Sequence, residues 1–152
     1  MKRRQLGGGE HVARNIRPRL LHITEEGETV IDPQAFRLRL KGEHGRPDDE
    51  PYVSASWLEC FAGSEDEKFA EVLSSSIYSL KPNAGIAICN VGKLEECGDQ
   101  HGQTIKCWHE PKEYSVCYAA IRGIQVTDPE TENLKTKIAG YAVTSFKRVR
   151  DI

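Results

Sequence analysis

Apolar and polar residues alternate along the first part of the chain with the two-residue period of β-strands. The run RLLHIT predicts a short strand over 19–24, and the turn EEGE follows it. In TVIDPQAFRLRL, over 29–40, the final apolar residues fall on one face and two arginines, Arg37 and Arg39, fall on the other. The pattern is typical of a half-buried strand, and the polar, glycine-bearing segment 41–51 is predicted to be a loop.

Helical spacing appears twice further along the chain. A capping box at Ser64 precedes apolar residues spaced for a helix over 65–79, and a box at Thr127 precedes a C-terminal helix carrying Leu134 and Ile138. A third box, at Ser56, predicts a short helix after it.

Two further apolar stretches complete the pattern. The segment AGIAICNV predicts a buried strand over 84–91, and the segments 103–109 and 114–124 predict a hairpin around EPKE. The order strands, helix, strands, helix predicts an α+β fold with a small, mostly antiparallel sheet covered by two main helices.

The length of 152 residues allows one domain with a real core. Residues 1–14 are basic, contain a glycine triplet and offer little to bury, so we expect a disordered basic arm there and a single globular domain over 15–152. The basic residues of the arm would suit an acidic partner, and a solvated tail is the alternative.

Charge and composition narrow the classes of function. The formal net charge of −2 argues against a nucleic-acid partner, and no apolar run reaches the roughly 20 residues that span a bilayer. The basic N-terminus lacks an apolar stretch typical of a secretory signal, which predicts a cytoplasmic location. With five cysteines and no such signal, we expect reduced thiols.

One stretch, ECGDQHGQTIKCWH over 96–109, brings Cys97, His101, Cys107 and His109 close together in sequence. Alternation in a strand places Cys107 and His109 on one face, so two metal ligands could converge there. The spacing does not match a common zinc module, whose ligands come in tight pairs such as C-x2-C. We therefore predict a hairpin without metal, and keep a small zinc-binding module with these four ligands as an alternative.

Three stretches, VSASWLECF (53–61), AICNVGKL (87–94) and CWHEPKEYSVCYAAIRGI (107–124), together resemble a group of small, uncharacterised bacterial proteins. That group carries a serine before a Trp-Leu-Glu run, then an Asn-Val-Gly strand end and a His-x-Pro segment. The resemblance implies a bacterial protein and no particular activity. The chain departs from the group at Cys117 and Tyr118, where members often carry a Ser-His pair, so chemistry that depends on that histidine is not expected here.

An enzymatic alternative can be assembled from motifs typical of ADP-ribosyltransferases, which bind NAD. Arg19 or His22 would hold the dinucleotide, Ser54 of the Ser-Ala-Ser stretch would brace the sugar, and Glu130 or Glu132 would stabilise the oxocarbenium-like state. Acidic residues in the first turn of a helix are also explained by the helix dipole, which weakens this alternative.

The preferred hypothesis is a non-catalytic domain that acts through a protein partner without a cofactor, with zinc or NAD belonging only to the two alternatives. The oligomeric state stays open. Exposed aromatic and arginine side chains are typical of partner contacts. The residues that we expect to contact the partner are Trp57, Trp108, Arg14 and Arg17.

Overall fold

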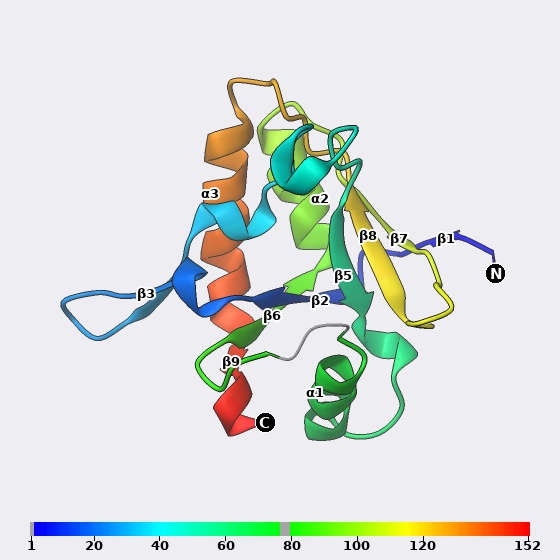
Figure 1. Cartoon of the computed structure of the whole chain (residues 1–152), viewed down its shortest axis with the longest axis vertical. Helices are drawn as coiled ribbons and strands as arrows, with labels where there is room; N and C mark the ends of the chain where they lie inside the picture. The colour runs from blue at the N-terminus through cyan, green and yellow to red at the C-terminus, as the bar shows by residue number, and fades with distance from the viewer. Residues whose placement is uncertain (1, 77–79) are drawn as a thin grey trace.

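An antiparallel sheet forms the centre of the fold (Figure 1), in a computed structural model that describes residues 2–76 and 80–152. Within these residues, seven strands lie in the order β1-β7-β8-β5-β2-β6-β9, and β3 and β4 form a separate hairpin. The strands are β1 Arg4–Gln5, β2 His11–Ile16, β3 Leu21–Ile23, β4 Thr29–Ile31, β5 Val53–Trp57, β6 Gly85–Asn90, β7 Lys106–His109, β8 Tyr118–Arg122 and β9 Phe146–Arg148.

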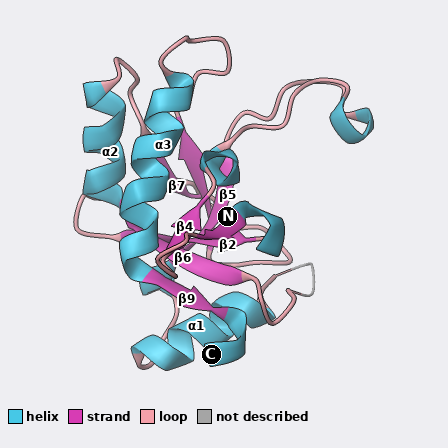
Figure 2. Cartoon of the chain, turned by 90° about the vertical axis from the view of Figure 1, so that its left-hand side faces the viewer, coloured by secondary structure: helices cyan, strands magenta, loops and turns pink. Residues whose placement is uncertain are grey.

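Helices cover both faces of this sheet. The helices α2 and α3 lie side by side against one face, and α1 lies near the C-terminus against the other (Figure 2). Within the described residues the helices are α1 Glu65–Ser74, α2 Val91–Gln100 and α3 Thr131–Ala142, with short 3-10 turns η1 Pro18–Leu20, η2 Pro33–Phe36, η3 Glu43–Gly45, η4 Leu58–Cys60, η5 Val143–Ser145 and η6 Val149–Asp151.

The buried strand predicted over 84–91 corresponds to β6, which is covered on both faces. Ala87 and Cys89 belong to the large core beneath α2 and α3, whereas Ile86 packs with Phe69 and Val72 of α1 in a second, smaller core. Successive side chains of a strand point to opposite faces, so a continuous apolar sequence serves two layers at once.

The predicted α+β class is confirmed, with more strands and one more helix than the sequence indicated. The helix α2 was missed because Gly92 and Gly98 lower its helical propensity. Both glycines have a packing reason. A Cβ on Gly98 would lie 2.5 Å from the carbonyl oxygen of Gln103, and one on Gly92 would lie 3.0 Å from that of Gly8.

Element boundaries differ from the predictions in several places. The capping box at Ser64 is confirmed, but the helix ends at Ser74, and positions 77–79 of the predicted helix lie outside the described residues. Ser56 belongs to strand β5 rather than to a cap, and α3 begins after Glu130, without a side-chain cap from Thr127. The hydrogen bonds of the sheet take precedence over the local capping pattern at Ser56.

The prediction of a disordered basic arm over 1–14 was wrong for the residues that the structure describes. Strand β1 pairs with β7, and β2 is a central strand that pairs with both β5 and β6. The apolar residues of this segment are few but well placed, since Leu6, Val12 and Ala13 are all buried. Pairing of β1 with β7, and of β2 with both β5 and β6, satisfies the backbone of this segment and orders it despite its basic composition.

The cysteines also differ from expectation. Cys60, at the end of η4, forms a disulfide with Cys117, just before β8, whereas the remaining three, Cys89, Cys97 and Cys107, are free and buried. The spacing of 57 residues between the two gave no sequence signal for pairing. Among the described helices, none combines the length and apolar character that crossing a membrane requires.

Candidate functional site

A cleft opens in the sheet where strands β2 and β5 separate. These strands pair only at Val12–Trp57 and Ala13–Ser56, whereas β2 stays paired with β6 as far as Ile16. Beyond Ala13 the two strands run in different directions (Figure 1), and the space between them is part of a cleft of about 1020 Å³. The interrupted ladder leaves backbone groups of β5 without a strand partner, so other groups must bind them.

The side chain of Arg14 extends from β2 into this gap and binds a backbone carbonyl of β5 that has no partner on β2. Its Nε donates to the carbonyl oxygen of Ala35 at 3.1 Å, and its Nη1 donates to both the carbonyl oxygen and the hydroxyl of Ser54, at 2.8 and 2.9 Å. These bonds fix the plane of the guanidinium group. Within the described residues its Nη2 group has no acceptor, which leaves that end of the side chain available to a ligand.

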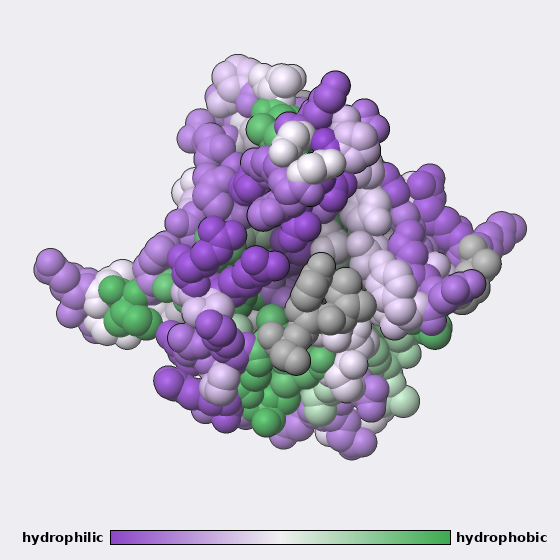
Figure 3. Space-filling model, in the orientation of Figure 1, coloured by the Kyte–Doolittle hydropathy of each residue, from purple (hydrophilic) through white to green (hydrophobic). Residues whose placement is uncertain are grey.

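The cleft is strongly basic. Of the described residues that line it, seven are arginine or lysine and one, Glu50, is acidic. Hydrophilic residues gather on this face of the molecule (Figure 3), above the more apolar area around α1 and the C-terminus. The basic lining residues are Arg14, Arg17, Arg19, Arg37, Arg39, Arg46 and Lys81.

The positive charge is only partly compensated. Arg37 forms a bidentate pair with Glu43, with both nitrogen–oxygen distances at 2.9 Å. Burial lowers the pKa of Arg14, and repulsion from Arg39 and Arg17 lowers it further, while attraction to Glu50 opposes the shift. The mutual repulsion of like charges favours the binding of an anion between them.

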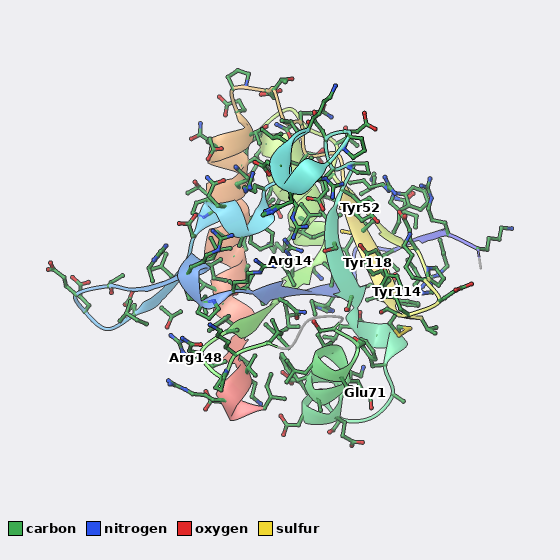
Figure 4. All side chains as sticks on the ribbon, viewed as in Figure 1. Arg14, Tyr52, Glu71, Tyr114, Tyr118 and Arg148 are labelled. Atoms are coloured by element: carbon green, nitrogen blue, oxygen red, sulfur yellow. A yellow bond between two sulfur atoms is a disulfide. The ribbon has the colours of Figure 1, made fainter. Side chains whose placement is uncertain are left out.

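Three tyrosines form one wall of the cleft, which we call the tyrosine wall: Tyr52, Tyr114 and Tyr118 (Figure 4). The ring centroids of Tyr52 and Tyr118 are 6.2 Å apart, as are those of Tyr114 and Tyr118, and both pairs meet edge to face. Burial and the hydroxyl of Tyr52 raise the pKa of Tyr118, so its hydroxyl stays protonated at neutral pH. The wall therefore offers aromatic rings and the neutral hydroxyl group of Tyr118 opposite the basic residues.

Two polar atoms at the cleft are buried without a partner among the described residues. They are Oδ1 of Asn15, which follows Arg14 on β2, and Nε of Arg46, in the segment after η3. An unpaired buried donor or acceptor costs about 1–3 kcal/mol. A bound ligand that supplies the missing partners would recover part of this cost.

The residues expected to contact a partner fall in two places. Arg14 and Arg17 line the cleft, as structured residues rather than parts of a mobile arm. Trp57 and Trp108 lie elsewhere in the sheet. The guanidinium of Arg4 lies over the ring of Trp57 at 4.5 Å, and that of Arg3 lies over the ring of Trp108 at 4.4 Å. The structure therefore does not gather the four residues into one surface.

The five residues of the ADP-ribosyltransferase alternative are also divided. Arg19 and Ser54 line the cleft, and His22 instead contacts Asp32 at 3.0 Å. Glu130 contacts His101, with 3.2 Å between Oε2 and Nδ1. Glu132 pairs with Lys135 at 2.7 Å on α3 and does not line the cleft. An acidic catalytic residue facing Ser54 is thus not supplied by either glutamate.

The four residues of the zinc alternative do not converge. Cys97 is buried within α2, His101 ends that helix beside Glu130, and the ring of His109 contacts the carbonyl oxygen of Val116 at 2.7 Å. Across residues 2–76 and 80–152, no group of three or more histidine, cysteine or acidic side chains is placed to hold a metal ion. Burial raises the pKa of the Cys107 thiol to about 12, which disfavours the thiolate that zinc binds.

Sequence reasoning named Arg14, Arg17, Arg19 and Ser54 for separate roles but did not predict that they line one cleft. The predicted strand over 29–40 was wrong beyond Ile31, where β4 ends and η2 follows, although Arg37 and Arg39 of that stretch do line the cleft. No sequence pattern indicated the tyrosine wall, because Tyr52 and Tyr114 lie in separate segments that only the fold brings together.

Comparison with known proteins adds no relative to this picture. No protein-family model matches the chain, and no curated protein or solved structure resembles it at a significant level. Function is therefore inferred from the geometry of the cleft.

Proposed function

We propose that the protein is a binding domain whose basic cleft holds a phosphate-bearing anion. The observation that carries this proposal is the concentration of seven arginine and lysine residues against one glutamate in a single concave site, in a chain whose net charge is −2. Arginine forks match the geometry of phosphate oxygens, and a cleft with walls of low dielectric strengthens the attraction.

Two features support binding rather than catalysis. The half-buried guanidinium of Arg14 is already held by Ala35 and Ser54, so it can receive an anion with little reorganisation. Glu50 carries the only carboxylate among the described residues that line the cleft, and it accepts a hydrogen bond from the backbone nitrogen of Arg39 at 2.8 Å. This contact assigns the carboxylate a structural role.

The proposal differs from the sequence-based hypothesis of a protein partner, which stays a prediction, as do the bacterial origin and the suspected family. The cytoplasmic location also stays a prediction, and the Cys60–Cys117 disulfide counts against it, because disulfides persist mainly in oxidising compartments.

Titration calorimetry of the full chain with inorganic triphosphate tests the proposal. We expect saturable binding, and we expect the double variant Arg17→Gln/Arg39→Gln to bind at least about tenfold more weakly. Each hydrogen bond to a charged group contributes about 1.5–3 kcal/mol, and 1.4 kcal/mol corresponds to tenfold in affinity.

The matched control is Lys93→Gln/Lys137→Gln, which removes the same charge from exposed positions on α2 and α3, outside the cleft. It should bind like the unaltered protein. Equal weakening by both double variants would show a general charge effect, and the absence of any binding heat would overturn the proposal.

A further inference from the structure

The shape and lining of the cleft allow a more specific assignment of its ligand. We propose that the ligand is a single strand of nucleic acid, with phosphates bound by the arginines and unstacked bases placed on the tyrosine wall. This inference rests on the proposed function, because it names the class of phosphate-bearing anion that the cleft binds. It departs from the expectation drawn from net charge, which averages over the whole surface and hides a local basic site.

The first argument is the extent of the cleft and the spread of its charges. Its volume of about 1020 Å³ lies at the upper limit of the roughly 300–1,000 Å³ typical of small-molecule sites. The basic residues come from three separate segments, 14–19, 37–46 and Lys81, rather than from one loop that cradles a single group. A backbone with repeated phosphates fits such dispersed cations better than one compact anion does.

The tyrosine wall supplies the second argument. Arg122 lies over the ring of Tyr52 at 4.5 Å, and Lys112 lies near the ring of Tyr118 at 5.3 Å, so cations already occupy these two aromatic rings. Tyr114 is 59% exposed, and its ring has no such cation among the described residues. An exposed tyrosine beside a basic cleft is the arrangement on which single-stranded bases stack.

The third argument comes from Asn15. Asn15 lines the cleft, and its buried Oδ1 atom has no hydrogen-bond partner in the described part of the chain. A base amino group or a sugar hydroxyl would supply the missing donor. Asn15 follows Arg14 on β2, and both residues line the cleft.

These features favour a single strand over a duplex. In a duplex the base faces are stacked on one another, and a concave site reaches mainly the phosphates. Stacking on Tyr114 and contact with Asn15 both require a base that has left the stack.

Fluorescence anisotropy with a fluorescein-labelled single-stranded oligonucleotide of mixed sequence tests the inference. A probe of about ten nucleotides suits the roughly 4–16 nucleotides that single-strand-binding folds occupy. We expect binding that weakens steeply with salt, competition by inorganic triphosphate, and little competition by a duplex of the same sequence.

Substitutions at Tyr114 separate stacking from charge. Tyr114→Ala should weaken oligonucleotide binding by roughly tenfold while leaving triphosphate binding unchanged, and Tyr114→Phe, which keeps the ring, should retain the affinity. Tyr114 is exposed, so neither change should impair folding. The double variant Arg17→Gln/Arg39→Gln should weaken both ligands and reduce the salt dependence.

The outcomes distinguish this inference from the proposed function. Triphosphate binding without oligonucleotide binding would leave the proposed function standing and overturn the inference, whereas binding of neither would overturn both. Duplex competition as strong as that of the single strand, or oligonucleotide binding indifferent to Tyr114→Ala, would also overturn the inference.

Discussion

The two edges of strand β2 differ in how far they are paired with a neighbouring strand. Toward β6 the ladder continues from His11 to Ile16, and the helices α2 and α3 seal that region into the large core. Toward β5 the ladder stops after Ala13, and the freed space becomes the basic cleft. The comparison shows how a sheet can form a site without a long inserted loop. One arginine, Arg14, satisfies backbone groups that a paired strand would otherwise satisfy, and the separation exposes a row of polar side chains.

The two regions should therefore respond differently to mutation, and the largest effect is expected in the closed one. Leu134 of α3 is fully buried in the large core, and Leu134→Ala should lower the free energy of unfolding by about 2–5 kcal/mol, because it removes apolar contacts and leaves a cavity. Urea unfolding followed by circular dichroism measures this. Arg17→Gln, at an exposed position in the open region, should change stability by no more than about 0.5 kcal/mol.

Similar losses of stability in these two variants would contradict the division into a packed region and a binding region. The affinity for triphosphate should show the opposite order of effects in the two variants. The folded Leu134→Ala protein should bind triphosphate normally, whereas Arg17→Gln should bind it more weakly.

A second, smaller effect concerns the link between the two regions. The Cys60–Cys117 disulfide joins the segment before α1 to the connection that carries Tyr114. Replacing both cysteines with serine should cost about 2–4 kcal/mol, because the unfolded chain then loses a constraint across 57 residues. Urea unfolding with and without dithiothreitol measures it. The reductant should lower the midpoint of the unaltered protein and leave that of the double variant unchanged.

An unaltered protein that is indifferent to dithiothreitol, although its thiols are shown to be reduced, would show that the crosslink contributes nothing to stability. The single variant Cys89→Ala is a useful companion, since it removes a buried free cysteine without touching the crosslink.

The contrast between the two regions also explains what the sequence could and could not predict. The closed region follows local rules. Strand β6 is a continuous apolar run, α1 begins at a capping box, and α3 repeats apolar residues at helical spacing. All three were recognised. Helix α2 was missed because it contains glycines at positions where tertiary contacts leave little room for a side chain.

The open region depends on distances along the chain that no local pattern encodes. Arg14 contacts Ser54 across 40 residues, and the tyrosine wall unites Tyr52 with Tyr118 across 66. The net charge of the chain did not indicate a basic site, because the acidic residues that offset these arginines lie mostly outside the cleft. The sequence patterns named Arg14, Arg17, Arg19 and Ser54 in separate hypotheses, and the alternation around Arg37 and Arg39 was interpreted as one face of a strand.

The smallest of these effects concerns an ion pair beside the tyrosine wall. Arg122 donates to Glu110 through Nε and Nη2 at 2.7 and 2.8 Å, and the same guanidinium covers the ring of Tyr52. The hydrogen bonds from Arg122 lower the pKa of Glu110 below its ordinary value of 4.5. A lowered carboxylate pKa stabilises the fold above the ordinary value, and that contribution is lost as the pH falls through the folded-state value.

The variant Glu110→Gln should therefore be less stable than the unaltered protein at pH 7 by about 1–2 kcal/mol. This is below the value of a fully buried charged hydrogen bond, because Arg122 is partly exposed. The difference should shrink as the pH falls below 4.5, since protonation removes the same charge from the unaltered protein. Urea unfolding at pH 7, 5 and 3 measures the trend, and Glu43→Gln, in the more exposed pair with Arg37, should show a weaker one. A gap that stays constant with pH would mean that the carboxylate of Glu110 acts through its shape and not through its charge.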